Sequence, residues 1–406
     1  MEVIYSHIAG IDIGKRQSVV YVRTPKVETT RSFGMMTEDL LSLSDWLHEC
    51  GVRQVAMEST GVYWKPIYNL LEGDEFELWL VNARDFRAVP GRKTDIQDAQ
   101  WLGDLLRYGL LRRSFVPAKA QRELRELVRY RRSLIEERSR EFNRLEKVLE
   151  GANVKLGAVV SKLTGKSVRL MLEAMVAGES NPEKLAALAQ GRLRQKHTEL
   201  VQALHGILGA HQRFMLKEQL GHLSELDERI TRLDAEITER LCPFAQELER
   251  LQTIPGVGPT IAQELAAEMG LDMSRFASSQ QLAAWAKLAP GNNESAGKRK
   301  HGRTGHGNRY LRAALVEAAH AAGRKAGTYL HAQYRRLAAR RGAKRAAVAV
   351  AHSILTIAYH LLDRHTTYQD LGANYFDERK EQQVVQRLQQ RLERLGYTVD
   401  VHKQVA

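Results

Sequence analysis

The sequence predicts an α/β domain at its N-terminus followed by largely helical regions, so the fold class is α/β plus all-α. Two observations predict this. Short runs of strand-forming residues alternate with helical patterns at the start of the chain, and apolar residues recur every three or four positions through most of the remainder. We therefore divide the chain into an α/β domain, a coiled-coil helical arm, a C-terminal helical domain and an accessory amphipathic tail. Their expected bounds are 1–115, 116–250, 251–375 and 376–406.

Charge and cysteine content narrow the classes of protein. The 406 residues carry a net charge of +13. The excess is uneven, with −2 in residues 1–115, +4 in 116–250 and +11 in 251–406. A basic C-terminal part predicts nucleic acid as the partner. Cys50 and Cys242 form no paired motif. Their spacing argues against a disulfide scaffold or a zinc module and fits a reducing compartment, the cytoplasm.

Neither a secretory signal nor a membrane span is predicted. The N-terminus, MEVIYSHIAGID, has no basic segment followed by an apolar one. Ala346–Leu362 is free of formal charge, but it is short for a span and contains His352, Ser353 and His360. We expect it to be a buried core helix.

The first region contains four strand-forming runs, with helical patterns between them. The first two runs are joined by the turn Gly14–Gln17 and predict a β-hairpin, with Asp12 near the end of its first strand. The third run leads into Glu58. Strands that alternate with helices predict a mixed sheet. The strands are expected at His7–Ile13, Ser18–Arg23, Gln54–Ala56 and Leu78–Val81, and the helices at Glu38–His48 and Tyr63–Leu71.

Four acids of this region form a candidate metal site. Thr94 is a predicted N-cap, and the helix after it places Asp95 and Asp98 on one face, with Cβ atoms roughly 5–6 Å apart. With Asp12 and Glu58 they supply hard oxygen ligands that suit Mg²⁺ or Mn²⁺. Acids in a first helical turn also favour the helix dipole, so each one alone has a structural explanation. Their order, two on strands and a pair on a helix, matches the RNase H fold as junction resolvases use it.

The second region predicts a helical arm. A first helix is expected from Lys119 to about Leu149 and an irregular stretch around Gly151–Gly191. A second helix has an unbroken apolar seam, which favours a coiled coil within the chain, between protomers, or both. A solvated helix with a single core stripe is the competing interpretation. The seam residues are Leu223, Leu226, Ile230, Leu233, Ile237 and Leu241.

The third region begins with a hairpin between helices, Leu251–Pro259, whose sequence IPGVG resembles the helix–hairpin–helix signature. Gly256 and Gly258 would allow backbone N–H groups to point at a phosphate where the next helix starts. A plain tight turn between two helices is the alternative. Helices are then expected at Ser279–Lys287 and from Asn308 to Gly323.

Pro290–Arg312 predicts a basic, glycine-rich loop that meets phosphate, with Ser295 as a hydroxyl near its start. Between Lys298 and Arg312 it has six Lys or Arg and no acid, although a solvated flexible loop explains the same composition. Eight more Lys or Arg and no acid follow from Ala321 to Arg345, as expected of a face along a phosphate backbone. The candidate nucleic-acid contacts are Arg92, Lys93, Lys298, Arg299, Lys300, Arg303, Arg309 and Arg312, besides the two hairpin glycines.

Four stretches together resemble one family. They are IDIGK, MESTGVYWKPI, VNARDFRAVPGRKTDIQDAQWL and LAPGNNESAGKRK. The chain resembles the DEDD-type insertion-sequence transposases, described as bridge-RNA-guided serine recombinases, over roughly 5–115 and 250–365. The resemblance implies a RuvC-like RNase H fold for the first domain and a serine transposase domain near the C-terminus. It also implies that Asp12, Glu58, Asp95 and Asp98 are the metal-binding set and that Ser295 is the nucleophile.

The implied function is strand exchange of an insertion sequence through a DNA–phosphoserine intermediate. The implied partners are double-stranded DNA, a structured bridge RNA and further copies of the chain, in a homodimer that assembles to a tetramer. Two alternatives stay open. One is a metal-dependent Holliday-junction-type endonuclease that uses water and leaves Ser295 idle. The other is a non-catalytic nucleic-acid-binding scaffold, suggested by the basic C-terminal part.

Overall fold

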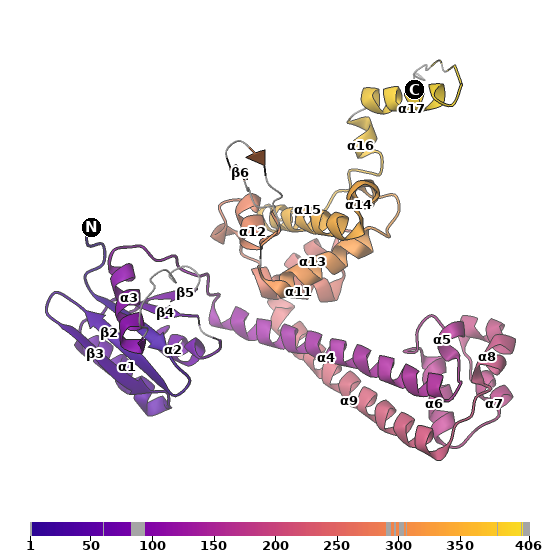
Figure 1. Cartoon of the computed structure of the whole chain (residues 1–406), viewed down its shortest axis with the longest axis horizontal. Coiled ribbons are helices and arrows are strands. Elements are labelled where there is room, and N and C mark those ends of the chain that lie inside the picture. The colour runs from indigo at the N-terminus through magenta and orange to yellow at the C-terminus, as the bar shows by residue number, and fades with distance from the viewer. Residues whose placement is uncertain are drawn as a thin grey trace. The chain divides into compact units, whose positions relative to one another are not determined.

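The computed structural model divides the chain into two compact units, Met1–Lys119 and Ala120–Ala406. Figure 1 shows the order of their elements. The structure describes residues 2–59, 61–82, 94–289, 294–295, 298–299, 304–305, 307–379, 381–398 and 400. Of these, it describes the backbone alone at 294–295, 298–299, 382–384 and 387.

The first unit is built on a five-stranded mixed sheet in the order β3-β2-β1-β4-β5. The first three strands are antiparallel neighbours, and β4 and β5 run parallel to β1. The predicted hairpin and mixed sheet are confirmed, in an RNase H-like α/β arrangement. Only β3 was not predicted, because it is a polar edge strand with one buried residue, Phe33. The strands are β1 Ile8–Ile13, β2 Gln17–Arg23, β3 Glu28–Gly34, β4 Gln54–Glu58 and β5 Glu77–Val81.

Helices cover both faces of this sheet. α1 (Thr37–Glu49) and α2 (Trp64–Leu71) share one apolar core with alternate strand residues, whereas α3 (Asp95–Arg107) shares a separate core with the intervening ones. In β1, Ile11 belongs to the α1/α2 core and Ile8 to the α3 core. Successive strand residues point to opposite faces, so the face of every residue in β1 and β4 follows from these two cores.

Two glycines bring α3 unusually close to the sheet. A Cβ atom on Gly10 of β1 would collide with the carbonyl oxygen of Ala99 and lie 2.5 Å from the Gly103 amide nitrogen of α3. A Cβ atom on Gly103 would lie 2.7 Å from the Tyr21 ring. The helix therefore rests backbone against backbone on β1.

The second unit begins with the arm, whose long helices are α4 (Lys119–Gly151) and α9 (Ala210–Leu241). Their apolar stripes pack on each other, for example Leu134 of α4 with Leu226 and Ile230 of α9. The two predicted helices therefore pack on each other within the chain, and a coiled coil, within the chain or between protomers, stays a prediction. The prediction of an irregular stretch around Gly151–Gly191 was wrong, because short helices form there around an apolar core of their own. The elements at the arm tip are α5 Leu156–Val159, α6 Lys166–Val176, α7 Pro182–Ala187, the 3₁₀ helix Gly191–Lys196 and α8 His197–Leu204.

The remainder of the second unit is a helical domain and tail. Within the described residues, α15 is the one helix long and apolar enough to cross a membrane. Its Val350 and Ile354 are fully buried among the surrounding helices, as expected of a core helix. The helices are α10 Ala245–Gln252, α11 Pro259–Met269, α12 Ser279–Trp285, α13 Arg309–Ala322, α14 Tyr329–Arg341, α15 Ala343–Asp363, α16 Tyr375–Glu378 and α17 Glu381–Glu393, with 3₁₀ turns at Cys242–Phe244 and Met273–Arg275.

Gly10→Ala should destabilise the first unit by about 1–3 kcal/mol or more, because the added methyl group must push the α3 backbone away from β1. Gly73→Ala is the matched control, since a Cβ atom at that position meets nothing within 4 Å. Urea unfolding followed by tryptophan fluorescence measures both variants. Equal stability of the two would contradict the close contact between α3 and β1.

Candidate active site

The side chains of Asp12 and Glu58 point to the same face of the sheet. Asp12 lies opposite Val19 of β2, and Glu58 lies opposite Val81 of β5. Both valines belong to the α3 core. Residues directly opposite each other in a sheet share a face, so the two carboxylates point to the α3 side. β1 and β4 are parallel neighbours whose last described pair is Ile11 with Met57, so the acids follow at adjacent strand ends.

The first turn of α3 supplies the other two acids. The Thr94 hydroxyl accepts a hydrogen bond from the Gln97 amide at 3.3 Å, which confirms the predicted N-cap. Because the cap fixes where the helix begins, Asp95 and Asp98 both lie in its first turn. The Asp95 residue is exposed and Asp98 is half-buried. Their negative charges also interact favourably with the positive end of the helix dipole.

The pKa of Asp12 indicates that the other three acids lie near it. Its pKa is raised from the ordinary 3.8 to about 6, first by burial and then by the negative charges of Asp95, Asp98 and Glu58. A backbone hydrogen bond at Ile13 acts in the opposite direction. Since each of the other three carboxylates acts on Asp12, the fold gathers all four predicted acids at one end of the sheet.

The chemistry of this quartet suits a hard divalent cation. All of its side-chain donors are carboxylate oxygens, the ligands that Mg²⁺ and Mn²⁺ prefer. Burial and then the negative charges of the other three acids raise the pKa of Asp12, and a bound cation would offset both effects. In the described part of the chain, no three acidic, histidine or cysteine side chains stand close enough to hold an ion as placed. The quartet therefore fits a metal by its chemistry without a preformed cage.

Ser295 lies on a short β-ladder. β6 (Glu294–Ser295) pairs antiparallel with β7 (Lys298–Arg299), and Ser295 is opposite Lys298. The predicted loop thus contains a hairpin, with a basic strand beside the serine backbone. Four other predicted contacts lie outside the described residues, namely Arg92, Lys93, Lys300 and Arg303.

Arg309 and Arg312, two predicted phosphate contacts, have partners within the protein. Arg312 donates to the Thr304 hydroxyl and to the Gly305 carbonyl at 3.4 Å. The exposed Arg309 donates to the Tyr310 hydroxyl at 2.6 Å. Arg312 therefore fastens the segment that precedes α13, and its contact with phosphate stays a prediction, as does that of Arg309.

The two hairpin glycines have different surroundings. Gly256 has a φ of +90°, and a Cβ atom there would collide with the Ala318 carbonyl of α13, so packing alone requires glycine. The next amide, that of Val257, donates to the Ile254 carbonyl at 3.0 Å. Gly258 is exposed at the start of α11 with nothing within 4 Å of a Cβ position. Phosphate contacts at both glycines stay predictions, and Gly258 has the space for one.

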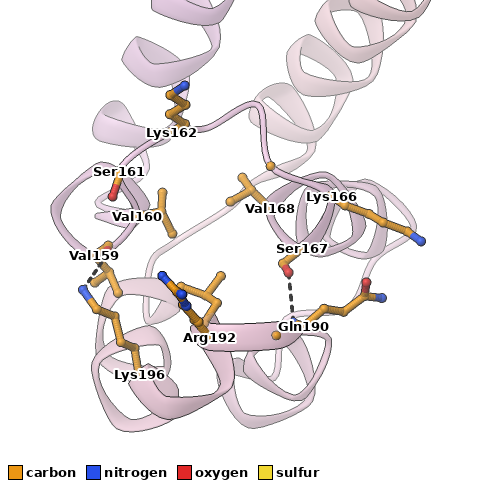
Figure 2. A pocket seen from close by; sticks show the side chains of 13 residues that line it. Val159, Val160, Ser161, Lys162, Lys166, Ser167, Val168, Gln190, Arg192 and Lys196 are labelled. Carbon is orange, nitrogen blue, oxygen red and sulfur yellow. Dashed lines mark hydrogen bonds between the residues drawn. The ribbon is translucent and has the colours of Figure 1, made fainter. Parts of the chain in front are cut away.

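A cavity of about 520 Å³ lies at the arm tip, outside the unit that holds the quartet. Figure 2 shows Arg192 extending toward the side that holds Val160, whereas Lys162 and Lys166 point away from the middle of the cavity. Lys196, also in its wall, donates to the Val159 carbonyl at 3.1 Å. The cations around this cavity do not converge on one point.

Sequence reasoning missed the residues that seat the acids. Gly10 and Gly103 place α3 against β1, yet neither was singled out. A glycine inside a strand-forming run is a signal of close backbone approach, and Gly10 gives that signal within HIAGIDI. The helical Gly103 gives a weaker one, because only the partner strand shows why it is small.

Two family models match the chain, one over each of the regions that hold the predicted site residues. A transposase model of the DEDD, IS110 type matches residues 9–154, which contain the whole acid quartet. A model described as the IS116/IS110/IS902 family of transposases matches residues 248–335, which contain Ser295.

Similar individual proteins are transposases by name. A probable family 20 transposase of Pseudomonas aeruginosa is 27% identical over 69% of this chain and 75% of its own length. A putative transposase of Sinorhizobium fredii is 30% identical over 68% of this chain and 64% of its own. The transposase for insertion sequence element IS1111A of Coxiella burnetii is 36% identical over 30% of this chain and 35% of its own.

Asp12→Asn should stabilise the metal-free first unit at neutral pH. Below pH 3.8 Asp12 is protonated in the folded and unfolded chain, but between 3.8 and about 6 the unfolded chain releases the proton first. Stability of the wild type should thus fall as pH rises through this window, relative to the variant. After discounting for solvent at this half-buried carboxyl, we expect about 1–2 kcal/mol.

Urea unfolding in EDTA from pH 3.5 to about 7 measures this difference. Trp46, Trp64, Trp79 and Trp101 lie in the first unit, so their fluorescence follows its unfolding. Asp45→Asn, at an exposed acid of α1, is the control. A pH profile of Asp12→Asn parallel to the wild type would show that folding does not raise the pKa of Asp12.

Proposed function

The chain belongs to the IS116/IS110/IS902 family of transposases, and from that membership we propose that it exchanges DNA strands through a covalent link to Ser295. As a transposase it is a DNA phosphoryl-transfer enzyme that acts in insertion-sequence transposition. The observation that carries the proposal is the gathering of Glu58, Asp95 and Asp98 around Asp12.

In this proposal the first unit is a RuvC-like domain in which the quartet holds Mg²⁺ or Mn²⁺. When bound, such an ion supplies Lewis-acid polarisation of a phosphate oxygen. The protein's own contribution is to fix the acids in place. Strand ends of a packed sheet set Asp12 and Glu58, and a capped helix sets Asp95 and Asp98. Rigid elements of this kind hold ligands more precisely than loops do.

The serine step conserves phosphodiester bonds. The Ser295 hydroxyl oxygen attacks the scissile phosphorus and loses its proton, and a DNA–phosphoserine ester forms. The phosphorus–oxygen bond to one DNA strand breaks, and the departing oxygen takes up a proton as a hydroxyl. Attack by the hydroxyl of another strand then reverses these changes and frees Ser295. A serine hydroxyl is a weak nucleophile at its ordinary pKa, so this step depends on a positioned and polarised phosphate.

Basic residues hold the DNA in this reaction. Lys298 and Arg299 lie on the strand that pairs with the serine strand, a placement that suits stabilisation of charge developing on phosphorus. Gly256 and Gly258 contribute backbone N–H groups at the helix–hairpin–helix-like turn. The remaining contacts position the duplex without reading its sequence. They are Arg92, Lys93, Lys300, Arg303, Arg309 and Arg312.

The acids belong to the first unit and Ser295 to the second, so the proposed site is composite. We propose that homodimers, assembling to a tetramer, complete it. The tail supports an assembling role, because Leu388 and Leu392 of α17 are 56% and 39% exposed. Exposed apolar side chains aligned on one helix commonly mark a partner surface.

We also propose that a structured bridge RNA selects donor and target DNA by base pairing. Two observations support an additional polyanion. Residues 251–406 carry a net charge of +11, and the sequence resembles RNA-guided recombinases in several separate motifs. Such a partner would leave the protein to hold backbones while the RNA reads sequence.

Ser295→Ala should abolish the covalent protein–DNA adduct that survives denaturing electrophoresis. The probe is a labelled duplex with the element end from the native locus, incubated with the locus transcript and Mg²⁺. Asp12→Asn should lower adduct formation by about 100-fold or more, since it removes part of the charge stabilisation. Ser180→Ala, an exposed serine of the arm tip, should retain the wild-type yield.

Other outcomes separate the rival functions. Cleavage by Ser295→Ala with free 5′-phosphate ends would indicate a junction endonuclease that uses water. Full recombination by Asp12→Asn would indicate a scaffold whose catalysis lies in another protein.

The proposed guidance by RNA can be tested by purifying the protein from cells that carry its native locus and sequencing the bound nucleic acid. We expect one abundant transcript encoded beside the gene, with segments complementary to donor and target DNA. Recovery of no enriched RNA would overturn guidance and leave the serine chemistry intact.

A further inference from the structure

A buried carboxylate joins the arm to the helical domain. Glu268, near the end of α11, has a side chain that is 1% exposed. It accepts two hydrogen bonds from Arg129 of α4, 2.7 Å from Nε to Oε1 and 2.8 Å from Nη2 to Oε2. This paired geometry fixes both the distance and the orientation of the two helices.

The same carboxylate also holds the start of α13. The Asn308 Nδ2 atom donates to Glu268 Oε2 at 2.5 Å. The Asn308 Oδ1 atom accepts from the amides of Tyr310 and Leu311, at 3.0 and 3.2 Å, as the N-cap of α13. Because the amide NH₂ faces the carboxylate and the amide oxygen faces the N–H groups, Asn308 connects α11 to α13 in one orientation.

Neighbouring side chains strengthen this junction. The Arg129 guanidinium also lies over the Tyr310 ring, 4.4 Å from its centroid. Arg125 of α4 donates to the Ala267 carbonyl at 2.9 Å and to the Glu268 carbonyl. The arm helix therefore contacts the end of α11 and the first turn of α13 through several directed bonds.

Asn308 is also the residue at which the serine segment, residues 290–307 that carry Ser295, meets α13. Just before it, a Cβ atom on Gly307 would lie 2.5 Å from the Ala286 carbonyl at the end of α12. Arg312, one turn into α13, bonds Thr304 and Gly305. The segment that carries Ser295 thus ends at a residue whose position depends on Glu268.

We propose that Glu268 is a positioning residue for strand exchange, which acts by holding Asn308 and so fixes the serine segment relative to the arm helix α4. The proposal rests on the proposed role of Ser295. A buried ion pair adds little net stability over apolar packing, so stability alone does not account for a carboxylate with three directed donors at this point. What those donors provide is a single geometry between arm and serine segment.

The chain contains a matched pair for comparison. Glu264, one turn earlier on α11, accepts from Arg132 of α4 at 2.9 and 3.2 Å and is 9% exposed. It joins the same two helices with the same chemistry, and no contact described for it reaches Asn308. Glu264→Gln therefore weakens the junction between arm and helical domain while leaving the link to the serine segment in place.

The test uses the full chain with the duplex, transcript and Mg²⁺ described above. Asn308→Ser keeps a capping oxygen and removes the donor to Glu268. We expect single-turnover adduct formation to fall about 10- to 100-fold with DNA affinity unchanged, because misplacement of a reacting group by about 1 Å has that effect. Glu268→Gln should behave alike, whereas Glu264→Gln should stay within about twofold of the wild type after correction for its folded fraction.

The decisive variant exchanges the carboxylate of Glu268 and the amide of Asn308. In Glu268→Gln with Asn308→Asp, the glutamine amide can donate to the aspartate, which still caps α13. Its adduct rate should exceed that of either single variant by at least about tenfold. The absence of this rescue, or an equal rate loss in Glu264→Gln, would overturn the proposal.

Hydrogen exchange at residues 304–312 separates this proposal from that of the serine nucleophile. Asn308→Ser should speed exchange there more than Glu264→Gln does, whether or not Ser295 is the nucleophile. Adduct formation by Ser295→Ala would overturn the proposal that Ser295 is the nucleophile. The hydrogen-exchange result for Asn308→Ser would still stand. Equal exchange in the two variants would show that Glu268 does not hold the segment.

Discussion

The close contact between α3 and β1 is the constraint on which the acid quartet depends. Gly10 and Gly103 permit the backbones of helix and strand to approach to a distance that any Cβ atom at position 10 would prevent. Asp12 lies two residues farther along the same strand, and Asp95 and Asp98 lie in the first turn of the same helix. The packing of two small residues therefore sets how near the helix acids come to Asp12, whose pKa is raised by burial and then by their negative charges.

The two units treat buried charge in opposite ways. In the first, burial and then the negative charges of three other acids raise the pKa of Asp12, so the fold bears a cost at the site. In the second, each buried carboxylate of α11 faces an arginine of α4, and Glu268 also faces an asparagine. Removing one partner of such a pair typically costs about 3–5 kcal/mol. The gathered like charges belong to the candidate active site, and the carboxylates that face arginines belong to the junction between α4 and α11.

This division gives physical meaning to the separation of acids and serine between the units. The carboxylates need only a rigid sheet and a capped helix, both of which form within the first 119 residues. In the second unit, Glu268 links the arm helix to Asn308, where the segment that carries Ser295 ends. In the proposed reaction, assembly of several copies of the chain brings the acids and the serine together.

The sequence by itself determined the features that depend on neighbouring residues. The hairpin around Gly14–Gln17, the Thr94 cap and the coiled-coil seam follow from local propensity and periodicity. The four acids and Ser295 are predicted site residues, and the motifs that resemble a known family indicate them. Only the tertiary structure decided that Asp12 and Glu58 share the α3 face, because this depends on pairing between strands far apart in the chain. It also showed that packing against Ala318 requires glycine at position 256, and that Asn308 donates a hydrogen bond to Glu268. Long-range partners of this kind are selected by burial and hydrogen bonding in the folded chain, which no local pattern records.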